Sequence, residues 1–214
     1  IVDALIFVTK IPDYPSPATA CLMQKRLRLP TTAAAFDVNL GCSGYVYGLW
    51  MASQLLAGSD SKRALMLCGD ISSRSFGKSD TPSRPLFGDA GTATALERDE
   101  NTAPLYCVVG TDGGGGRHIS IEYGGNRHTF APYVMTQEPV PEEFLKKSNL
   151  NLNGPEVFTF TLRAVPKLLK DTLDYASLTM DDIDYFVFHQ ANKFILEHLR
   201  KKTKIPEDKY SISM

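Results

Sequence analysis

The stretch Ala34-Ala35-Phe36-Asp37-Val38-Asn39-Leu40-Gly41-Cys42-Ser43-Gly44 joins a short apolar strand to the start of a helix. Beyond it, apolar residues recur at helical spacing, which predicts one buried helix face made of Tyr45, Leu49, Ala52 and Leu56. Gly58 is expected just past the end of this helix, as its C′ residue. A strand that runs into a helix through a glycine-bounded turn is typical of a layered α/β protein.

The turn places Cys42 at or next to a helix N-terminus. Unpaired backbone N–H groups and the helix dipole stabilise a thiolate at such a position. Gly41 and Gly44 keep the turn tight and let a substrate approach the backbone. Cys42 is therefore interpreted as a nucleophile, and the alternative is a small apolar residue that caps a core helix.

Strands and helices alternate along the rest of the chain. We expect strands at residues 5–8, 64–68, 92–96, 105–109 and 183–188, and a last one from Tyr210 to Met214. Helices are expected at about 17–28, with Ser16-Pro17 as N-cap and first residue, at about 156–175, and from Asn192 to Thr203. Residues 110–155 hold glycine runs and several prolines, which is typical of a functional or covering loop.

Two segments of the chain resemble each other. Residues 2–8 (VDALIFV) are similar to residues 183–189 (IDYFVFH), and each segment is followed by a helix, by Leu29-Pro30 or Ile205-Pro206, and by a strand. This internal repeat predicts two similar α/β halves.

His189 follows the predicted strand of the second half. Its ring is therefore expected at the carboxyl end of a sheet, the edge where ligands bind in open α/β folds. A histidine there can act as a hydrogen-bond donor, acid or base. The alternative is a buried structural histidine.

Composition excludes several classes of protein. The 214 residues are 43% hydrophobic and carry a net charge of −1, so disorder and nucleic-acid binding by charge are not expected. Apolar runs stay well below the ~20 residues that a membrane-spanning helix needs. The four cysteines show no disulfide or zinc pattern and are expected to be reduced, cytosolic and mostly in the core. The basic run 200–204 is interpreted as a solvated helix face, with a dock for an acidic partner as the alternative.

Taken together, four pieces in order resemble the β-ketoacyl-acyl-carrier-protein synthase III family, within the thiolase-fold condensing enzymes. They are residues 36–45, 86–91 (LFGDAG), 153–158 (NGPEVF) and 184–192 (DYFVFHQAN). The resemblance implies a thiolase-like fold of duplicated α/β layers (α-β-α-β-α), incomplete at both ends. It implies most of the N-terminal half at 1–109, covering and substrate loops at 110–155, and part of the C-terminal half at 156–214.

The resemblance also implies a catalytic set of Cys42 as nucleophile, His189, and an Asn beyond Met214. It implies contacts to substrate or carrier from Gln190, Ala191, Asn192, Lys193, Phe194 and Arg84. Gly88-Asp89-Ala90-Gly91 is one glycine shorter than the usual motif, and Phe194 stands where the family often has an Arg for carrier docking. These departures are compatible with a specialised relative.

The implied reaction is the decarboxylative condensation of an acyl thioester, carried on coenzyme A, with malonyl-acyl carrier protein. No metal or redox cofactor is expected, since acyl-coenzyme A is a substrate. A homodimer in the cytoplasm, without nucleic-acid partners or a membrane span, is expected. Two alternatives stay open: a non-catalytic partner subunit of a synthase-like pair, and a related thiolase-fold acyltransferase or hydroxymethylglutaryl-coenzyme A synthase-type enzyme.

Overall fold

The computed structural model describes residues 1–77, 80–81 and 83–213. The chain forms two compact units. The first unit consists of residues 1–72 and 88–109, and the second of residues 73–87 and 110–214. The assignment of thiolase halves and covering loops to particular residue ranges stays a prediction.

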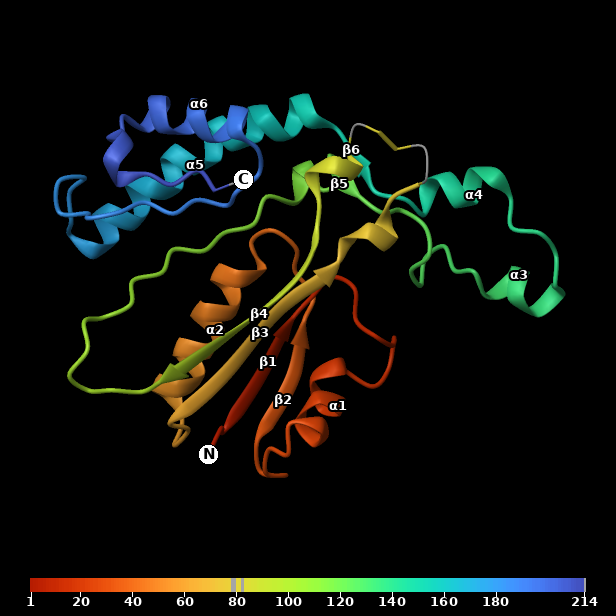
Figure 1. The fold of residues 1–214 in the computed structure, drawn as a ribbon, viewed down its shortest axis with the longest axis horizontal. Coiled ribbons are helices and arrows are strands. Elements are labelled where there is room, and N and C mark those ends of the chain that lie inside the picture. The colour runs from red at the N-terminus through yellow and green to blue at the C-terminus, as the bar shows by residue number, and fades with distance from the viewer. Residues whose placement is uncertain (78–79, 82, 214) are drawn as a thin grey trace. The chain divides into compact units, whose positions relative to one another are not determined.

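The first unit is built on a four-stranded sheet of order β2-β1-β3-β4 (Figure 1). Its elements are β1 (Ala4–Val8), α1 (Thr19–Arg26), β2 (Ala34–Val38), α2 (Gly44–Gly58), β3 (Arg63–Ile71) and β4 (Asp89–Glu97). β1 is parallel to β2 and to β3, and β4 is antiparallel to β3. Because the chain moves from β1 to β2 and then back across β1 to β3, right-handed crossovers place α1 and α2 on opposite faces of the sheet.

Helix α2 lies very close to the sheet because two of its buried residues are glycines. It buries Gly44, Gly48, Ala52 and Leu56, one residue every four. A Cβ atom on Gly44 would lie 2.5 Å from Val8 Cγ1, and one on Gly48 would lie 2.6 Å from Met66 Sδ. The predicted face is confirmed at Ala52 and Leu56 but is wrong at Tyr45, which is 40% exposed. The spacing of apolar side chains cannot reveal the whole buried face of α2, because its first two residues, Gly44 and Gly48, have no side chain.

Helix α1 begins later than predicted and has a different cap. It starts at Thr19, and its N-cap residue Ala18 provides no side-chain hydrogen bond. The carboxylate of Asp37 on β2 instead accepts hydrogen bonds from the Thr19 and Ala20 N–H groups, both at 2.7 Å. The predicted cap at Ser16-Pro17 is therefore wrong, because a strand supplies the acceptor that the local sequence lacks.

The second unit contains short elements and two longer helices. The short elements are η1 (Ser72–Ser75), which begins at the unit boundary, η2 (Arg84–Leu86), η3 (Gly113–Gly115), β5 (Ile119–Ser120), α3 (Ala131–Thr136), α4 (Glu142–Lys147), β6 (Asn151–Leu152) and η4 (Glu207–Lys209). The longer helices are α5 (Gly154–Ala176) and α6 (Lys193–Thr203), both close to their predicted bounds. Asn153 caps α5, and Phe186, Leu196, Ile205 and Tyr210 form a small core beside it.

The internal repeat extends to the way in which the two helices end. Arg28 after α1 and Lys204 after α6 both have φ 57°, each two residues before a proline. The next N–H group reaches back five residues in both cases, from Leu29 to Gln24 O at 3.0 Å and from Ile205 to Arg200 O at 3.1 Å. Both helices thus close in the same Schellman-type turn.

Some predicted strands do not form. Residues 183–188 and 210–213 share only one parallel bridge, between Phe186 and Tyr210, and Met214 lies outside the described residues. The side chain of Gln190 donates a hydrogen bond to the Ser211 carbonyl and accepts one from the Ser213 N–H group. In a strand, these two backbone groups would pair with the backbone of the neighbouring strand. Residues 105–109 form no strand, and β4 pairs along its whole length with β3 instead. Gly58 is the last helical residue of α2 rather than C′.

Within the described ranges, no helix has both the length and the apolar character needed to cross a bilayer.

The close approach of α2 makes a stability prediction. We expect Gly44→Ala in the full-length protein to lower the free energy of unfolding by about 1–3 kcal/mol, because the new Cβ overlaps Val8 Cγ1. Gly58→Ala on the same helix meets no atom within 4 Å and should be neutral or stabilising by up to about 1 kcal/mol. Denaturant unfolding of both variants checks this, and equal effects would contradict the packing account.

The buried hydroxyl of Tyr210 leads to a prediction about stability at alkaline pH. Its ring is buried and its hydroxyl donates to Leu196 O at 3.1 Å, and burial raises the pKa of Tyr210 to about 12. The folded state therefore holds this proton more tightly than the unfolded chain, whose tyrosine pKa is about 10. The contribution of the Tyr210 hydroxyl to the free energy of unfolding is complete below pH ~10 and is lost as the pH rises through ~12.

We therefore expect the free energy of unfolding to fall more steeply between these two pH values in the wild type than in Tyr210→Phe. The half-exposed Tyr185, changed to Phe, serves as the control and should keep the wild-type slope. If Tyr210→Phe also kept that slope, the buried hydroxyl would not be the group responsible.

Candidate functional site

Cys42 lies in a tight turn between β2 and α2. The Gly44 N–H group donates to Gly41 O at 2.8 Å, which closes the turn around Cys42 and Ser43. Ser43 is the N-cap residue of α2 and provides no side-chain cap hydrogen bond. Cys42 is exposed and directly precedes this N-cap. Its predicted place next to a helix N-terminus is confirmed.

The turn also lies at the point where the sheet changes direction. The loop after β1 leads to α1 and the loop after β2 leads to α2, and these helices cover opposite faces. In open α/β sheets, ligands bind outside the carboxyl ends of strands at such a switch point. Cys42 therefore occupies the edge of the first unit that is suited to a substrate.

Neighbouring strand ends are fixed by Asp70 at the end of β3. Its carboxylate accepts hydrogen bonds from Thr9 Oγ1 at 2.8 Å and from the Lys10 N–H group at 2.9 Å. The Thr9 N–H group donates in turn to Val38 O on β2 at 3.0 Å. These bonds hold the strand ends beside the Cys42 turn in a defined arrangement.

The other cysteines differ from Cys42. Burial raises the pKa of the Cys68 thiol, with a smaller contribution from Asp70, and burial also raises the pKa of Cys107. Both are partly buried, as expected for core thiols. Cys21 is exposed, and its thiol donates to Ala35 O at 3.6 Å. Exposure at a helix start therefore distinguishes Cys21 and Cys42 from the other two.

His189 lies in the second unit, in the loop between the bridge residue Phe186 and α6. Its side chain is exposed, and its carbonyl accepts a hydrogen bond from the Ala191 N–H group at 2.9 Å. Asn192 is the N-cap of α6, with its side-chain oxygen accepting from the Ile195 N–H group at 2.8 Å. His189 thus precedes a helix, as predicted, although the strand before it is reduced to one bridge.

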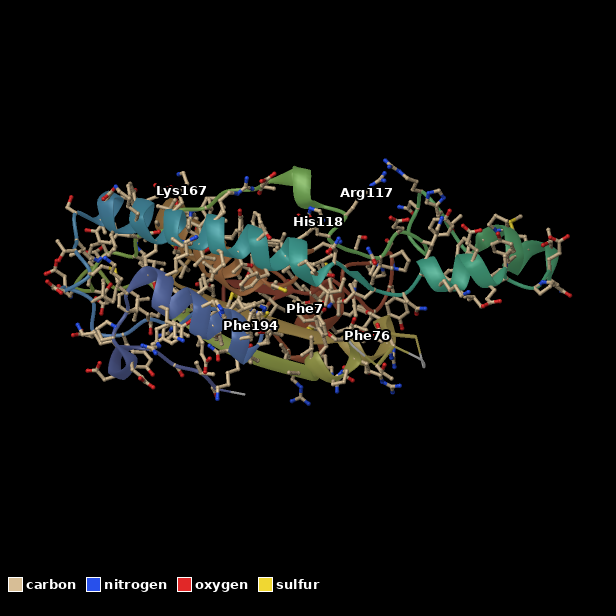
Figure 2. All side chains as sticks on the ribbon, turned by 90° about the horizontal axis from the view of Figure 1, so that it is seen from above. Phe7, Phe76, Arg117, His118, Lys167 and Phe194 are labelled. Carbon is tan, nitrogen blue, oxygen red and sulfur yellow. The ribbon has the colours of Figure 1, made fainter. Side chains whose placement is uncertain are left out.

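The residues predicted to contact substrate or carrier also belong to the second unit, whereas Cys42 belongs to the first. Lys193 Nζ lies 3.8 Å from Glu197 Oε1, and Arg84 is exposed in η2. Phe194 in the first turn of α6 (Figure 2) is 58% exposed and packs against Phe158 and His198 in tilted ring pairs, with ring centroids 5.2 and 4.1 Å apart. The roles of these residues and the pairing of Cys42 with His189 stay predictions.

Sequence reasoning missed the close packing at Gly48, the capping role of Asp37 and the backbone hydrogen bonds of Gln190, a residue that was predicted only as a substrate or carrier contact. A charged residue inside an apolar predicted strand was the available signal for Asp37, since a partly buried carboxylate needs hydrogen-bond donors. Within the part of the chain that the structure describes, no group of three or more His, Cys, Asp or Glu residues could hold a metal ion.

Two family models match the chain. The model described as 3-oxoacyl-(acyl-carrier-protein) synthase III matches residues 36–113, and its C-terminal counterpart matches residues 173–214. The first match contains Cys42 and the second contains His189. The names 3-oxoacyl and β-ketoacyl describe the same chemical group.

Curated relatives agree with these models. The chain is 33% identical to a putative 3-oxoacyl-(acyl-carrier-protein) synthase 3 of Campylobacter jejuni, over 97% of this chain and 58% of the relative. It is 34% identical to a β-ketoacyl-(acyl-carrier-protein) synthase III of Clostridium novyi, over 99% of this chain and 62% of the relative. The chain thus spans about three fifths of the length of these relatives.

Solved structures have the same fold. A crystal structure of a 3-oxoacyl-(acyl-carrier-protein) synthase III matches with a TM-score of 0.89 and 37% identity, over all of this chain and 64% of that one. A synthase from Burkholderia xenovorans matches with a TM-score of 0.85 and 40% identity, over 99% of this chain and 59% of that one. The predicted α/β fold of the thiolase type is therefore confirmed. On its sequence and its fold, the chain belongs to the 3-oxoacyl-(acyl-carrier-protein) synthase III family.

Proposed function

We propose that the full-length protein is an acyltransferase that condenses an acyl thioester, carried on coenzyme A, with malonyl-acyl carrier protein, releasing CO₂ and forming a β-ketoacyl thioester. The observation that carries the proposal is the place of Cys42 in an exposed turn before α2, at the switch point of the sheet. Family membership and the names of the relatives supply the substrate classes.

The first half-reaction transfers the acyl group to Cys42. The thiolate attacks the thioester carbonyl, and the tetrahedral intermediate expels the coenzyme A thiolate, which takes up a proton. Backbone N–H groups at the start of α2 favour both the thiolate and the oxyanion, since the N-cap residue Ser43 makes no side-chain hydrogen bond to them.

The second half-reaction forms the carbon–carbon bond. The malonyl thioester loses CO₂, and the electron pair of the broken bond becomes an enolate on the thioester. His189 donates a hydrogen bond to the thioester oxygen, together with an Asn beyond Met214, and so stabilises that charge. The carbanion attacks the acyl-Cys42 carbonyl and expels the Cys42 thiolate, which restores the enzyme.

The remaining assignments follow from this reaction. The steps use no metal or redox cofactor, and loops within residues 110–155 cover the acyl chain.

We further propose a cytoplasmic homodimer that forms through β4. In support, β4 pairs with β3 along nine residues, and no strand in the described ranges pairs with its other edge. A long edge strand of small residues is suited to pairing with a second copy.

The proposal predicts a covalent intermediate on Cys42. We expect intact-mass and peptide mass spectrometry of the full-length protein, after mixing with an acyl-coenzyme A, to show one acyl group on Cys42. Cys42→Ala should take up no acyl group and should lose the condensation activity. Cys21→Ala is the matched control, because Cys21 is also an exposed thiol at a helix start in the same unit. This variant should be acylated on Cys42 like the wild type.

Two results would contradict the proposal. One is a folded wild-type protein that takes up no acyl group on Cys42. The other is a Cys42→Ala variant that keeps full function in a reconstituted pair with a synthase-like chain, since it would favour the non-catalytic partner subunit.

A further inference from the structure

The side chain of Gln190, the residue after His189, is bonded to backbone groups of two separate segments. Its Nε2 donates to Phe188 O at 3.0 Å and to Ser211 O at 3.3 Å. Its Oε1 accepts from the Ser213 N–H group at 2.8 Å. The orientation of the carboxamide is unambiguous, because two carbonyls require the NH₂ side and an N–H group requires the oxygen side.

These three bonds replace a strand ladder. Residues 186–188 and 210–213 run alongside each other, yet they share only the Phe186–Tyr210 bridge. Beyond that bridge, the Gln190 carboxamide links the Phe188 carbonyl, which directly precedes His189, to the backbone of Ser211 and Ser213. The packing of Phe188 on Tyr210, with ring centroids 5.4 Å apart, supports the same junction.

His189 is therefore held from both sides. The preceding carbonyl, of Phe188, is bound by Gln190, and its own carbonyl is bound by the Ala191 N–H group. On the far side, Asn192 fixes the start of α6. In the aligned repeat of the first unit, Thr9 occupies the place of Gln190, and its hydroxyl likewise ties a strand end to a neighbouring strand through Asp70.

We propose that Gln190 is a positioning residue, which sets the backbone of His189 relative to residues 211–213 and so aims the imidazole for the condensation step. The inference rests on the proposed function of His189. Gln190 then acts through His189 and the backbone, and does not bind the carrier protein.

The geometry separates this role from a carrier contact. Both N–H bonds of the carboxamide and one lone pair of its oxygen are already used inside the unit. A side chain that contacts malonyl-acyl carrier protein would, when replaced, raise the KM for that substrate. A positioning residue would, when replaced, lower the kcat of condensation and leave that KM unchanged.

The test compares the two half-reactions in the full-length protein. Gln190→Met keeps the length of the side chain but loses all three hydrogen bonds, and Gln190→Glu loses the two donated bonds only. Gln54→Glu, at an exposed position of α2, is the control for the charge change and should behave like the wild type. Rates of acyl-Cys42 formation are measured by mass spectrometry, and condensation by CO₂ release at varied malonyl-acyl carrier protein.

We expect both Gln190 variants to form acyl-Cys42 at the wild-type rate. We expect the kcat of condensation to fall by about 100-fold, the size of effect that small misplacements of a catalytic group produce. Condensation at the wild-type rate, a raised KM with unchanged kcat, or parallel loss of both half-reactions would each overturn the inference. His189→Ala is measured alongside: if it condenses normally, the proposed role of His189 fails instead.

Discussion

The structure depends on how closely α2 lies against the sheet. Gly44 and Gly48 leave no room for a side chain between the helix and the Val8 and Met66 side chains. This contact fixes the start of the helix at the carboxyl end of β2, where the backbone turns sharply through Gly41, Cys42 and Ser43. A larger residue on this face would move the helix start, and the Cys42 thiol would move with it.

Two helix starts in the first unit differ in their electrostatics for a structural reason. The Asp37 carboxylate binds the first N–H groups of α1, so that its charge already balances the dipole there. The N-cap residue of α2, Ser43, makes no side-chain cap hydrogen bond, and Cys42 precedes it. Backbone N–H groups at a helix start favour the thiolate form of a nearby cysteine, and nucleophilic attack on a thioester requires that form. The His189 loop is built differently, because Asn192 caps α6 and Gln190 ties the loop to residues 211–213.

The sequence was informative wherever a local signal determines the structure. The turn at Cys42 and the approximate bounds of α5 and α6 were all predictable, because each depends on neighbouring residues. The repeat was visible as well, and the matching turns at Arg28 and Lys204 confirm it. The burial of Gly44 and Gly48 on α2, the cap from Asp37 and the bonds of Gln190 were not predictable, because each depends on contacts between residues far apart in the chain. The same limit explains the wrong strand at 105–109, since apolar alternation does not identify the neighbouring strand.

The most direct test of the account compares Cys42 with Cys21, two exposed thiols at the starts of two helices in the same unit. Full-length protein is treated with a limiting amount of iodoacetamide at about pH 7, where an unperturbed thiol is mostly protonated. Peptide mapping then gives the alkylation rate at each cysteine. The account predicts that Cys42 reacts much faster than Cys21, because the Asp37 carboxylate already binds the first N–H groups of α1, whereas the N-cap residue of α2, Ser43, makes no side-chain cap hydrogen bond. Equal rates at the two cysteines would contradict it.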